Sequence, residues 1–340
     1  MRSEFTRRSA LALGVLLVAA CSDSPTEPEA IGVTEAAPEL AVAAASNSWS
    51  TKAKEPSPRA RTKAAAINNV IYLVGGLKQQ NGITSTASLQ AYNTSTNSWT
   101  TKAQLPSARS DINGVSVING RLYVSGGANK SFDLTRTLFV YNPGTNSWTR
   151  RADLPTPAAC GAQGVIGGKL YVYAGCIAES PSLEDRFYRY DPATNVWVTL
   201  PPPPSRHTTP TAAGVINGKF YLAGGELNLN DPNLSTHVYN PATNSWAAKA
   251  SLPERQSAAA SAVLNGKLYA AGGTHDGPDY VVSTLRVYDP GSNSWMTKAS
   301  MPAPRYEAAG VAANGLFYVM GGWDRTGPPV PTGANEAYTP

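Results

Sequence analysis

The chain of 340 residues carries 28 Lys and Arg against 23 Asp and Glu, a formal net charge of +5, and only 15% of its residues are charged. Together with 30 Gly and 27 Pro, this low charge content argues against a helical or coiled-coil protein. A hydrophobic content of 42% is enough to bury a large core, so the composition also argues against an intrinsically disordered chain.

The first 20 residues have the pattern of an export signal. Arg2, Arg7 and Arg8 precede the apolar run ALALGVLLVAA at 10–20. As a helix this run would reach about 16 Å, too short for the roughly 30 Å of hydrocarbon in a bilayer, and small residues end it as at a cleavage site. Removal of residues 1–20 takes away three Arg and one Glu and lowers the net charge from +5 to +3. We therefore expect no nucleic-acid partner, which would need a concentrated basic face.

Residues 18–21 (VAAC) resemble the lipobox of bacterial lipoproteins, in which the Cys is diacylated and becomes the mature N-terminus. The resemblance implies lipidation at Cys21 and a protein anchored in the bacterial cell envelope, on the periplasmic or cell-surface side, since several acyl chains anchor firmly. The alternative is an ordinary secretory signal with a chance Cys. Thr6-Arg7-Arg8 resembles the twin-arginine export motif but lacks the Phe-Leu-Lys that usually follows. Residues 21–45, rich in Pro, Glu, Ser, Thr and Ala, predict a flexible tether.

From residue 48 onward one unit is repeated six times. Six tryptophans recur at intervals of 49 or 50 residues: Trp49, Trp99, Trp148, Trp197, Trp246 and Trp295. The motif Tyr-Asn/Asp-Pro-x-Thr/Ser-Asn-Ser-Trp recurs around them, and Tyr-x-x-Gly-Gly lies midway between them, except in the third unit, which reads YVYAG. A period of this length indicates a repeat architecture.

Each unit divides into four short strands, which we designate a to d. An Asn-Gly dipeptide in most units predicts a two-residue turn with φ > 0 between a and b, a variable loop leads to c, and an Asn/Asp-Pro turn leads to d with its Trp. Four-stranded units of about 49 residues around an axis make a β-propeller. The paired Gly, the spaced Tyr and Trp, and the Leu/Met-Pro before the next strand make residues 48–340 resemble the kelch-repeat family, whose known fold has one blade per repeat.

The two ends of the repeated region complement each other. The first element is a d strand around Trp49, and the last is a c strand at 335–338. We therefore expect an all-β, six-bladed kelch propeller over residues 46–340, in which the N-terminal d strand completes the blade begun by residues 306–338.

The b–c loops differ in every unit and emerge on the same face as the d–a connections, so we expect ligand binding on this face. The d–a connections carry Pro-x-x-Arg or a close variant in four blades, at Arg59, Arg109, Arg206 and Arg305. Guanidinium groups that converge on the channel mouth would suit a carboxylate, a phosphate or an acidic sugar. The alternative is that these arginines are framework groups bound to local carboxylates or carbonyls.

Four further residues on or near this face are candidates. Trp323 is the one Trp outside the repeat register, and it is either a platform for a sugar ring or a cap on the last blade. Tyr306 and His275 are further ligand-binding candidates, and Glu307 is a candidate acid/base group.

Cys160 and Cys176 predict a disulfide in the third blade. A turn at Gly167-Gly168 pairs Ile166 with Lys169, so the residue numbers of two directly opposite residues add up to 335. The numbers of the two cysteines add up to 336, which puts them one position away from direct opposition. An even pair so placed in an exported protein favours a disulfide. The alternative is a pair of free buried thiols.

The sequence predicts no transition-metal site and no cofactor. A metal site needs several converging His or Cys side chains, and the three His residues have no close spacing. Residues 226–233 (ELNLNDPN) offer acid and amide oxygens that could hold calcium, although this segment lacks the Gly and terminal Glu of an EF-hand loop.

These observations favour a monomeric, membrane-anchored binding module that recognises a protein or a glycan. The alternative is an enzyme, because the kelch family includes bacterial sialic-acid mutarotases, which are exported and six-bladed. That resemblance implies Glu307 as the acid/base group, beside Arg305 and Arg206. The copper-dependent galactose-oxidase-like relatives have seven blades and match less well. If the protein is an enzyme, we expect a deep, charged cavity that holds a Glu whose pKa is shifted by burial. If it is a binding module, we expect a broad, shallow rim.

Overall fold

The computed structural model describes residues 46–79, 82–177, 186–228, 231–275, 280–324 and 330–340. The signal segment 1–20, Cys21 and the tether 21–45 lie outside the described residues, so the structure does not test these predictions. Within the described ranges, no helix has the length and hydropathy that a bilayer crossing requires.

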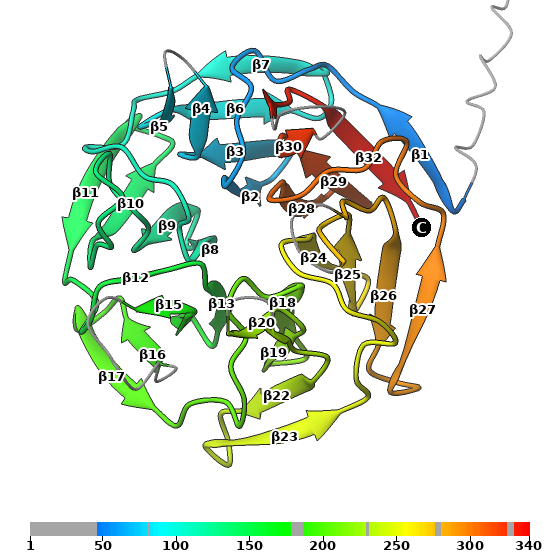
Figure 1. Ribbon diagram of the computed structural model, residues 1–340. Coiled ribbons are helices and arrows are strands. Elements are labelled where there is room, and N and C mark those ends of the chain that lie inside the picture. Colours follow the sequence, from blue (N-terminus) through cyan, green and yellow to red (C-terminus); the bar gives the residue numbers. More distant parts are fainter. Residues whose placement is uncertain (1–45, 80–81, 178–185, 229–230, 276–279, 325–329) are drawn as a thin grey trace, which may run out of the picture. The chain divides into compact units, whose positions relative to one another are not determined.

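Six antiparallel four-stranded sheets are arranged as blades around a central channel (Figure 1). The inner a strands are β2 (Lys63–Ile67), β8 (Gly114–Ile118), β13 (Ala162–Ile166), β18 (Ala212–Ile216), β24 (Ala260–Leu264) and β28 (Ala309–Ala313). The b strands are β3 (Val70–Val74), β9 (Arg121–Ser125), β14 (Lys169–Ala174), β19 (Lys219–Ala223), β25 (Lys267–Ala271) and β29 (Leu316–Met320). The c strands are β6 (Leu89–Asn93), β10 (Leu138–Asn142), β16 (Arg186–Asp191), β22 (Thr236–Asn240), β26 (Leu285–Asp289) and β32 (Asn335–Thr339). The outer d strands are β7 (Ser98–Thr101), β11 (Ser147–Arg151), β17 (Val196–Leu200), β23 (Ser245–Lys249), β27 (Ser294–Lys298) and β1 (Ser48–Thr51). The predicted all-β, six-bladed propeller is confirmed.

The Asn two residues before each repeated Trp links neighbouring blades in five of the six blades, and in the fourth blade Asn244 accepts from Tyr239 but not from Pro201, which has no N–H to donate. In the second blade, Asn146 has φ +50 and its Oδ1 accepts hydrogen bonds from Tyr141 Oη (2.7 Å) and from the backbone N–H of Ala103 (2.9 Å), which belongs to the connection after the first blade. Trp148 Nε1 donates to the carbonyl of the same Ala103 (2.8 Å). Each repeated Trp makes the equivalent bond to a carbonyl 45 or more residues away. The repeated motif therefore holds blade to blade, as its recurrence in every unit predicts.

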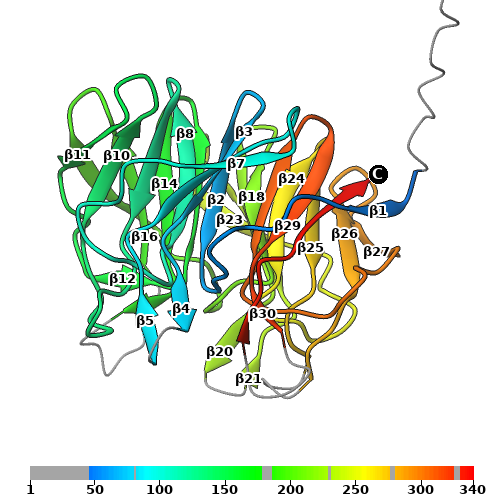
Figure 2. The ribbon, with the colours of Figure 1, turned by 90° about the horizontal axis from the view of Figure 1, so that it is seen from above.

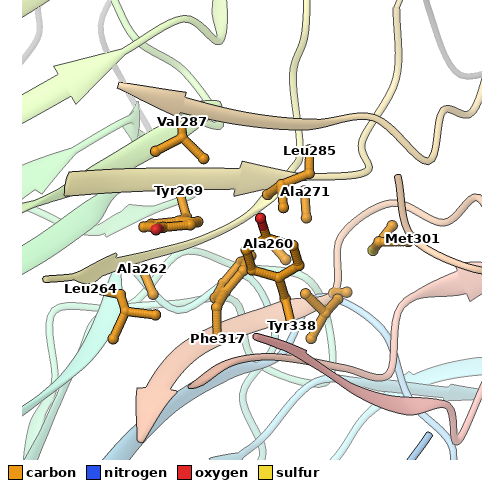
Figure 3. Close-up of a cluster of buried hydrophobic side chains, with 12 residues drawn as sticks. Ala260, Ala262, Leu264, Tyr269, Ala271, Leu285, Val287, Met301, Phe317 and Tyr338 are labelled. Atoms are coloured by element: carbon orange, nitrogen blue, oxygen red, sulfur yellow. The ribbon is translucent and has the colours of Figure 1, made fainter. Parts of the chain in front are cut away.

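Aromatic side chains fill the space between blades. Between the fifth and sixth blades, Tyr269 lies 5.7 Å from Phe317 and 6.1 Å from Tyr338, measured between ring centroids, within a cluster of buried residues (Figure 3). Such aromatic pairs bury a large apolar area and add roughly 0.5–1.5 kcal/mol each beyond it.

The ring of blades closes as predicted. β1 pairs with β32, and Trp49 lies opposite Tyr338. Asn47 occupies the position of Asn146 in this blade, because its Oδ1 accepts hydrogen bonds from Tyr338 Oη (2.8 Å) and Ala299 N (3.0 Å). The N-terminal strand thus completes the sixth blade.

The b–c loops and the d–a connections share one face of the ring, as predicted. Short loop strands project from this face (Figure 2): β4 (Leu77–Gln79), β5 (Ile83–Ser85), β12 (Ala158–Ala159), β15 (Cys176–Ile177), β20 (Glu226–Asn228), β21 (Asp231–Pro232), β30 (Trp323–Asp324) and β31 (Val330–Pro331). In every blade the first residue of the b–c loop pairs with a residue of the d–a connection: Ala60 with Leu77, Ser110 with Ala128, Ala159 with Cys176, Thr208 with Glu226, Ser257 with Thr274 and Tyr306 with Trp323. The two sets of loops therefore form one surface.

Candidate functional site

A closed ring of backbone hydrogen bonds surrounds the channel mouth on this face. One residue per blade has a φ between +48° and +55°: Arg61, Asp111, Cys160, Thr209, Ala258 and Glu307. Each donates its N–H to the carbonyl of its counterpart in the preceding blade: Arg61 to Glu307 (2.9 Å), Asp111 to Arg61 (3.2 Å), Cys160 to Asp111 (2.8 Å), Thr209 to Cys160 (3.0 Å), Ala258 to Thr209 (3.5 Å) and Glu307 to Ala258 (2.8 Å). We call these six residues the backbone ring. The left-handed conformation is costly for a residue with a side chain, so the closed ring of hydrogen bonds explains how six such residues persist.

A cavity of about 540 Å³ opens at the backbone ring and is lined from all six blades. Its lining residues are Arg61, Thr62, Lys63, Asp111, Ile112, Cys160, Cys176, Thr208, Thr209, Pro210, Glu226, Arg255, Gln256, Ser257, Ala258, Ala259, Thr274, His275, Tyr306, Glu307 and Ala308. A cavity of this volume with several polar groups is typical of a small-molecule site.

One side of the cavity carries a fixed cluster of charges from the sixth, first and second blades. Arg61 Nε donates to Glu307 Oε2 (2.7 Å), and its Nη1 lies 3.4 Å from Asp111 Oδ1. Trp323 Nε1 donates to the same Glu307 oxygen (2.8 Å). Burial raises the pKa of Glu307, an effect that Arg61 opposes and Asp111 reinforces. Burial alone would lower the pKa of Arg61, but the two carboxylates outweigh it and raise the pKa above its ordinary value. We call Arg61, Asp111 and Glu307 the charged triad.

The other side of the cavity presents hydroxyl groups from the fourth and fifth blades. Ser257 Oγ and Thr274 Oγ1 lie 2.9 Å apart, and Thr208 lies beside them on the same wall. Burial raises the pKa of Glu226, and a hydrogen bond with Ser257 opposes this shift. His275 Nε2 lies 3.9 Å from the exposed carboxylate of Glu254. We call Thr208, Glu226, Ser257 and Thr274 the hydroxyl wall, and its groups can donate to and accept from the hydroxyls of a polar ligand.

Two family models match this chain. Residues 115–322 match the model described as the KLHDC2/KLHL20/DRC7 Kelch-repeats domain, and residues 58–106 match the one described as the Kelch motif. The first match covers more than half of the chain. The chain belongs to the kelch-repeat family. A solved structure titled "Structure of YjhT" is similar to this kelch propeller, with a TM-score of 0.68 and 19% identity over 83% of this chain and 95% of that chain, which shows a common fold. No curated protein matches the chain.

Three of the kelch arginines predicted to bind ligand are buried away from the cavity. Arg59 is fully buried, and its guanidinium bonds Glu55 (2.9 Å) and the carbonyls of Gly75 and Ser88 (both 3.2 Å). Arg305 pairs with Glu336 (2.7 Å).

Arg109 is the third. Its guanidinium donates to the carbonyl of Ala108 (2.7 Å) and lies 5.7 Å from the centre of the Phe139 ring. These three arginines are framework groups, which is the alternative that the sequence left open. A ligand-binding role would require exposure that the structure does not give them.

Arg206 does not occupy the framework position that its spacing suggested. His207 occupies it in the fourth blade, two residues before Thr209 of the backbone ring, as Arg59 stands two residues before Arg61. His207 Nδ1 lies 2.8 Å from the carbonyl of Gly224, just as Gln256 Nε2 donates to the carbonyl of Gly272 (2.6 Å) in the fifth blade. Arg206 lies one residue earlier and is not among the cavity residues.

Trp323 is a cap and not a platform open to a sugar. Its side chain is only 4% exposed and packs against Ala60, Leu77 and Tyr306. Its indole N–H holds Glu307, as described above. By contrast, Tyr306, Glu307 and His275 line the cavity, where the sequence placed them.

The two cysteines lie together in the cavity wall. Ala159 pairs with Cys176, which confirms the predicted register in which opposite residues sum to 335. Both side chains are free thiols that contact each other, and the hydrogen bond with Cys176, together with burial, raises the pKa of Cys160 well above its ordinary value. The disulfide itself stays a prediction.

Metal binding stays untested. The described residues contain no group of three His, Cys, Asp or Glu side chains that could hold a metal ion. The predicted calcium segment 226–233 includes residues 229–230, which lie outside the described residues. Asn233, at its end, donates to Ser205 Oγ (3.1 Å) and accepts from Ser235.

The sequence reasoning named Glu307 but missed other residues that give the cavity its charge. Arg61 and Asp111 stand two residues beyond the framework arginines, and Lys63 and Glu226 also line the cavity. One signal could have found the first two: this position differs in all six repeats, whereas Arg recurs at the framework position.

Proposed function

We propose that this chain is an exported, lipid-anchored kelch propeller that binds a small polyhydroxylated ligand, such as the end of a glycan, in the cavity at the channel mouth. The observation that carries the proposal is the polar cavity of about 540 Å³, which every blade helps to line. Ligand pockets for small molecules fall in the range of roughly 300–1,000 Å³. A protein partner would instead need a broad, exposed rim, so the cavity favours the glycan over the protein.

The two sides of the cavity suit a sugar for different reasons. The hydroxyl wall offers short side chains that both donate and accept hydrogen bonds, as neutral sugar hydroxyls do. The charged triad is held in place by its own ion pairs, so it presents carboxylate and guanidinium edges without further ordering of side chains.

The anchor is compatible with access to the cavity. Asn47 precedes β1 and occupies the position that Asn146 has in the c–d turn of the second blade, whereas the loop strands lie on the other face of the ring (Figure 2). Lipidation at Cys21 belongs to this proposal.

Glu307 supports a second candidate function, a sugar isomerase of the mutarotase type. Mutarotation requires removal of a proton from one sugar oxygen and delivery of a proton to another. The Glu307 carboxyl has one oxygen fixed by Arg61 and Trp323, faces the cavity, and has a pKa raised by burial, as an acid/base group requires. Arg61 replaces Arg305 and Arg206 as the cation beside it.

The test uses the full-length chain with Cys21→Ala, to prevent lipidation, in a thermal-shift screen and on a glycan array that includes neutral, uronic and sialic sugars. We expect a hit that is lost in Ser257→Ala and Arg61→Ala and retained in Arg150→Ala, a matched exposed arginine. Absence of any sugar that shifts the melting temperature would contradict the proposal. Exchange of anomers, followed by NMR on the ligand found, would establish the isomerase.

A further inference from the structure

Lys63 is a departure from the repeat that blade packing does not explain. It is the first residue of the inner strand β2, and it pairs with Val74 as Ala260 pairs with Ala271 in the fifth blade. In the other five blades the first residue of the inner strand is Gly or Ala, and each is buried: Gly114, Ala162, Ala212, Ala260 and Ala309. Only the first blade places a long, charged side chain there, and this side chain lines the cavity.

The surroundings of Lys63 leave its amine without a direct ion pair. The titratable groups that interact with it are Cys160, Asp111 and Glu307. Both carboxylates are bonded to Arg61, and among the described residues none lies within 4 Å of Lys63 Nζ. Burial lowers the pKa of Lys63, and the two carboxylates and Cys160 oppose this shift only in part. An enclosed, desolvated lysine is an environment in which lysine acts as a nucleophile toward carbonyl compounds.

We propose that Lys63 is a carbonyl-binding residue, whose Nζ forms an imine with the aldehyde or ketone of an open-chain sugar or a similar small carbonyl compound held in the cavity. The geometry behind it is an amine that lines a polar cavity of sugar size, which Asp111 and Glu307 line as well. The inference deepens the proposed function and rests on it.

The reaction needs no oxidant or other reagent. The unprotonated amine attacks the carbonyl carbon, a C–N bond forms, and the carbonyl oxygen takes up a proton to give a carbinolamine. A second proton converts that hydroxyl into a leaving water molecule, and the nitrogen lone pair closes the C=N bond. One protonated amine and one carbonyl thus give one protonated imine and one water. The carboxylates of Asp111 and Glu307, which line the same cavity, can accept and return the protons.

The test treats the full-length Cys21→Ala chain with glyceraldehyde and sodium cyanoborohydride, which reduces an imine to a stable secondary amine, and maps the adducts by peptide mass spectrometry. Each unit by which a pKa is lowered gives about tenfold more free amine at neutral pH. We therefore expect Lys63 to be labelled at pH 7 faster than the exposed Lys249, and its labelling rate to stop rising at a lower pH than that of Lys249.

Two variants keep the test decisive. Lys63→Arg retains the charge and cannot form an imine, and Lys63→Met removes the charge at a similar length. We expect the adduct to disappear in both while Lys249 is labelled as before. Labelling of Lys63 no faster than that of Lys249 would overturn the inference. The thermal-shift screen separates the two proposals, because sugar binding without labelling leaves the proposed function intact, and labelling without sugar binding contradicts the function alone.

Discussion

Arg61 Nε lies 2.7 Å from Glu307 Oε2, so residues 246 positions apart in the chain join the first and last blades at the channel mouth. The backbones of the same two residues are joined as well, by the 2.9 Å hydrogen bond from Arg61 N to Glu307 O. The backbone ring thus fixes the positions of the two Cα atoms, and the ion pair fixes the orientations of the two side chains. A site built in this way depends on closure of the propeller.

Substitution Glu307→Gln should weaken ligand binding with little loss of stability. The amide can still accept from Trp323 Nε1, and Arg61, which is partly exposed, keeps Asp111, so we expect a loss of about 1 kcal/mol in unfolding free energy. Ligand affinity should fall at least tenfold, because a neutral amide replaces the carboxylate that lines the cavity and Arg61 keeps one of its two carboxylate partners. Calorimetric titration of the sugar found in the screen measures the first effect, and urea unfolding the second.

Asp153→Asn is the matched control, because it breaks the exposed pair between Arg150 and Asp153 (2.6 Å) outside the cavity. It should change neither quantity by more than about 0.5 kcal/mol. Equal losses of affinity in the two variants would rule out a specific role for Glu307.

Closure of the ring predicts a second result. Asn47→Ala removes the acceptor for Tyr338 Oη and Ala299 N and places Ala at a φ of +54. Two lost hydrogen bonds and a strained backbone predict a loss of about 2–3 kcal/mol. Hydrogen exchange should show faster opening of β1 and β32 in particular.

Asn97→Ala provides the comparison, since Asn97 Oδ1 accepts from Tyr92 Oη (2.7 Å) and Ala53 N (2.8 Å) within the continuous part of the chain. It should cost a similar free energy but open β6 and β7 instead. If Asn47→Ala left exchange of β1 and β32 unchanged, the N-terminal strand would not be what closes the ring.

The fold was predictable because its determinants repeat. The Tyr–Asn bond and the Trp–carbonyl bond recur in every blade, and the Asn also accepts a backbone N–H in five of the six. A period of 49 residues therefore predicts both the strand pattern and the closure of the ring. The framework arginines were visible for the same reason, and their recurrence was evidence for a role in the blade and against a role in ligand binding. Arg59 shows the distinction, because its Glu55 partner lies within its own blade connection.

The site was less predictable because its residues do not repeat. The backbone ring brings together the charged triad of Arg61, Asp111 and Glu307. No local sequence pattern predicts that the residue two positions after the framework Arg has a left-handed conformation. His207 and His237 illustrate the same limit. Their spacing of 30 residues suggests no contact, yet the d–a connection brings Nε2 of His207 to 2.9 Å from Nδ1 of His237 on β22.

The cysteine pair gives a third prediction. After export into an oxidising compartment, Cys160 and Cys176 should be joined, because the structure places their thiols in contact. Alkylation of the exported protein without reductant should then leave both cysteines unmodified, and prior reduction should add two labels. A loop of this length predicts a stabilisation of about 3 kcal/mol in the oxidised form, measurable by urea unfolding with and without reductant. Labelling of both thiols without reductant would refute the disulfide.

The buried histidine pair predicts a loss of stability in mild acid. Burial, reinforced by His237, lowers the pKa of His207 from 6.5 to about 4, although a hydrogen bond with Gly224 opposes the shift, and burial also lowers the pKa of His237. Both imidazoles are therefore neutral in the folded protein over a pH range in which the unfolded chain takes up protons. Stability from His207 is complete above pH 6.5 and is lost as the pH falls toward 4, by about 3 kcal/mol in all.

Urea unfolding between pH 7.5 and 4.5 measures this slope. The matched variant is His207→Gln, since Gln256 fills the same position in the fifth blade and donates to the carbonyl of Gly272. We expect the variant to lose about 2 kcal/mol less than the parent over this range, because no imidazole remains at the fully buried position, while the carboxylates that titrate in acid are common to both. Parallel slopes in the parent and in His207→Gln would mean that the pair is not the source of the acid sensitivity.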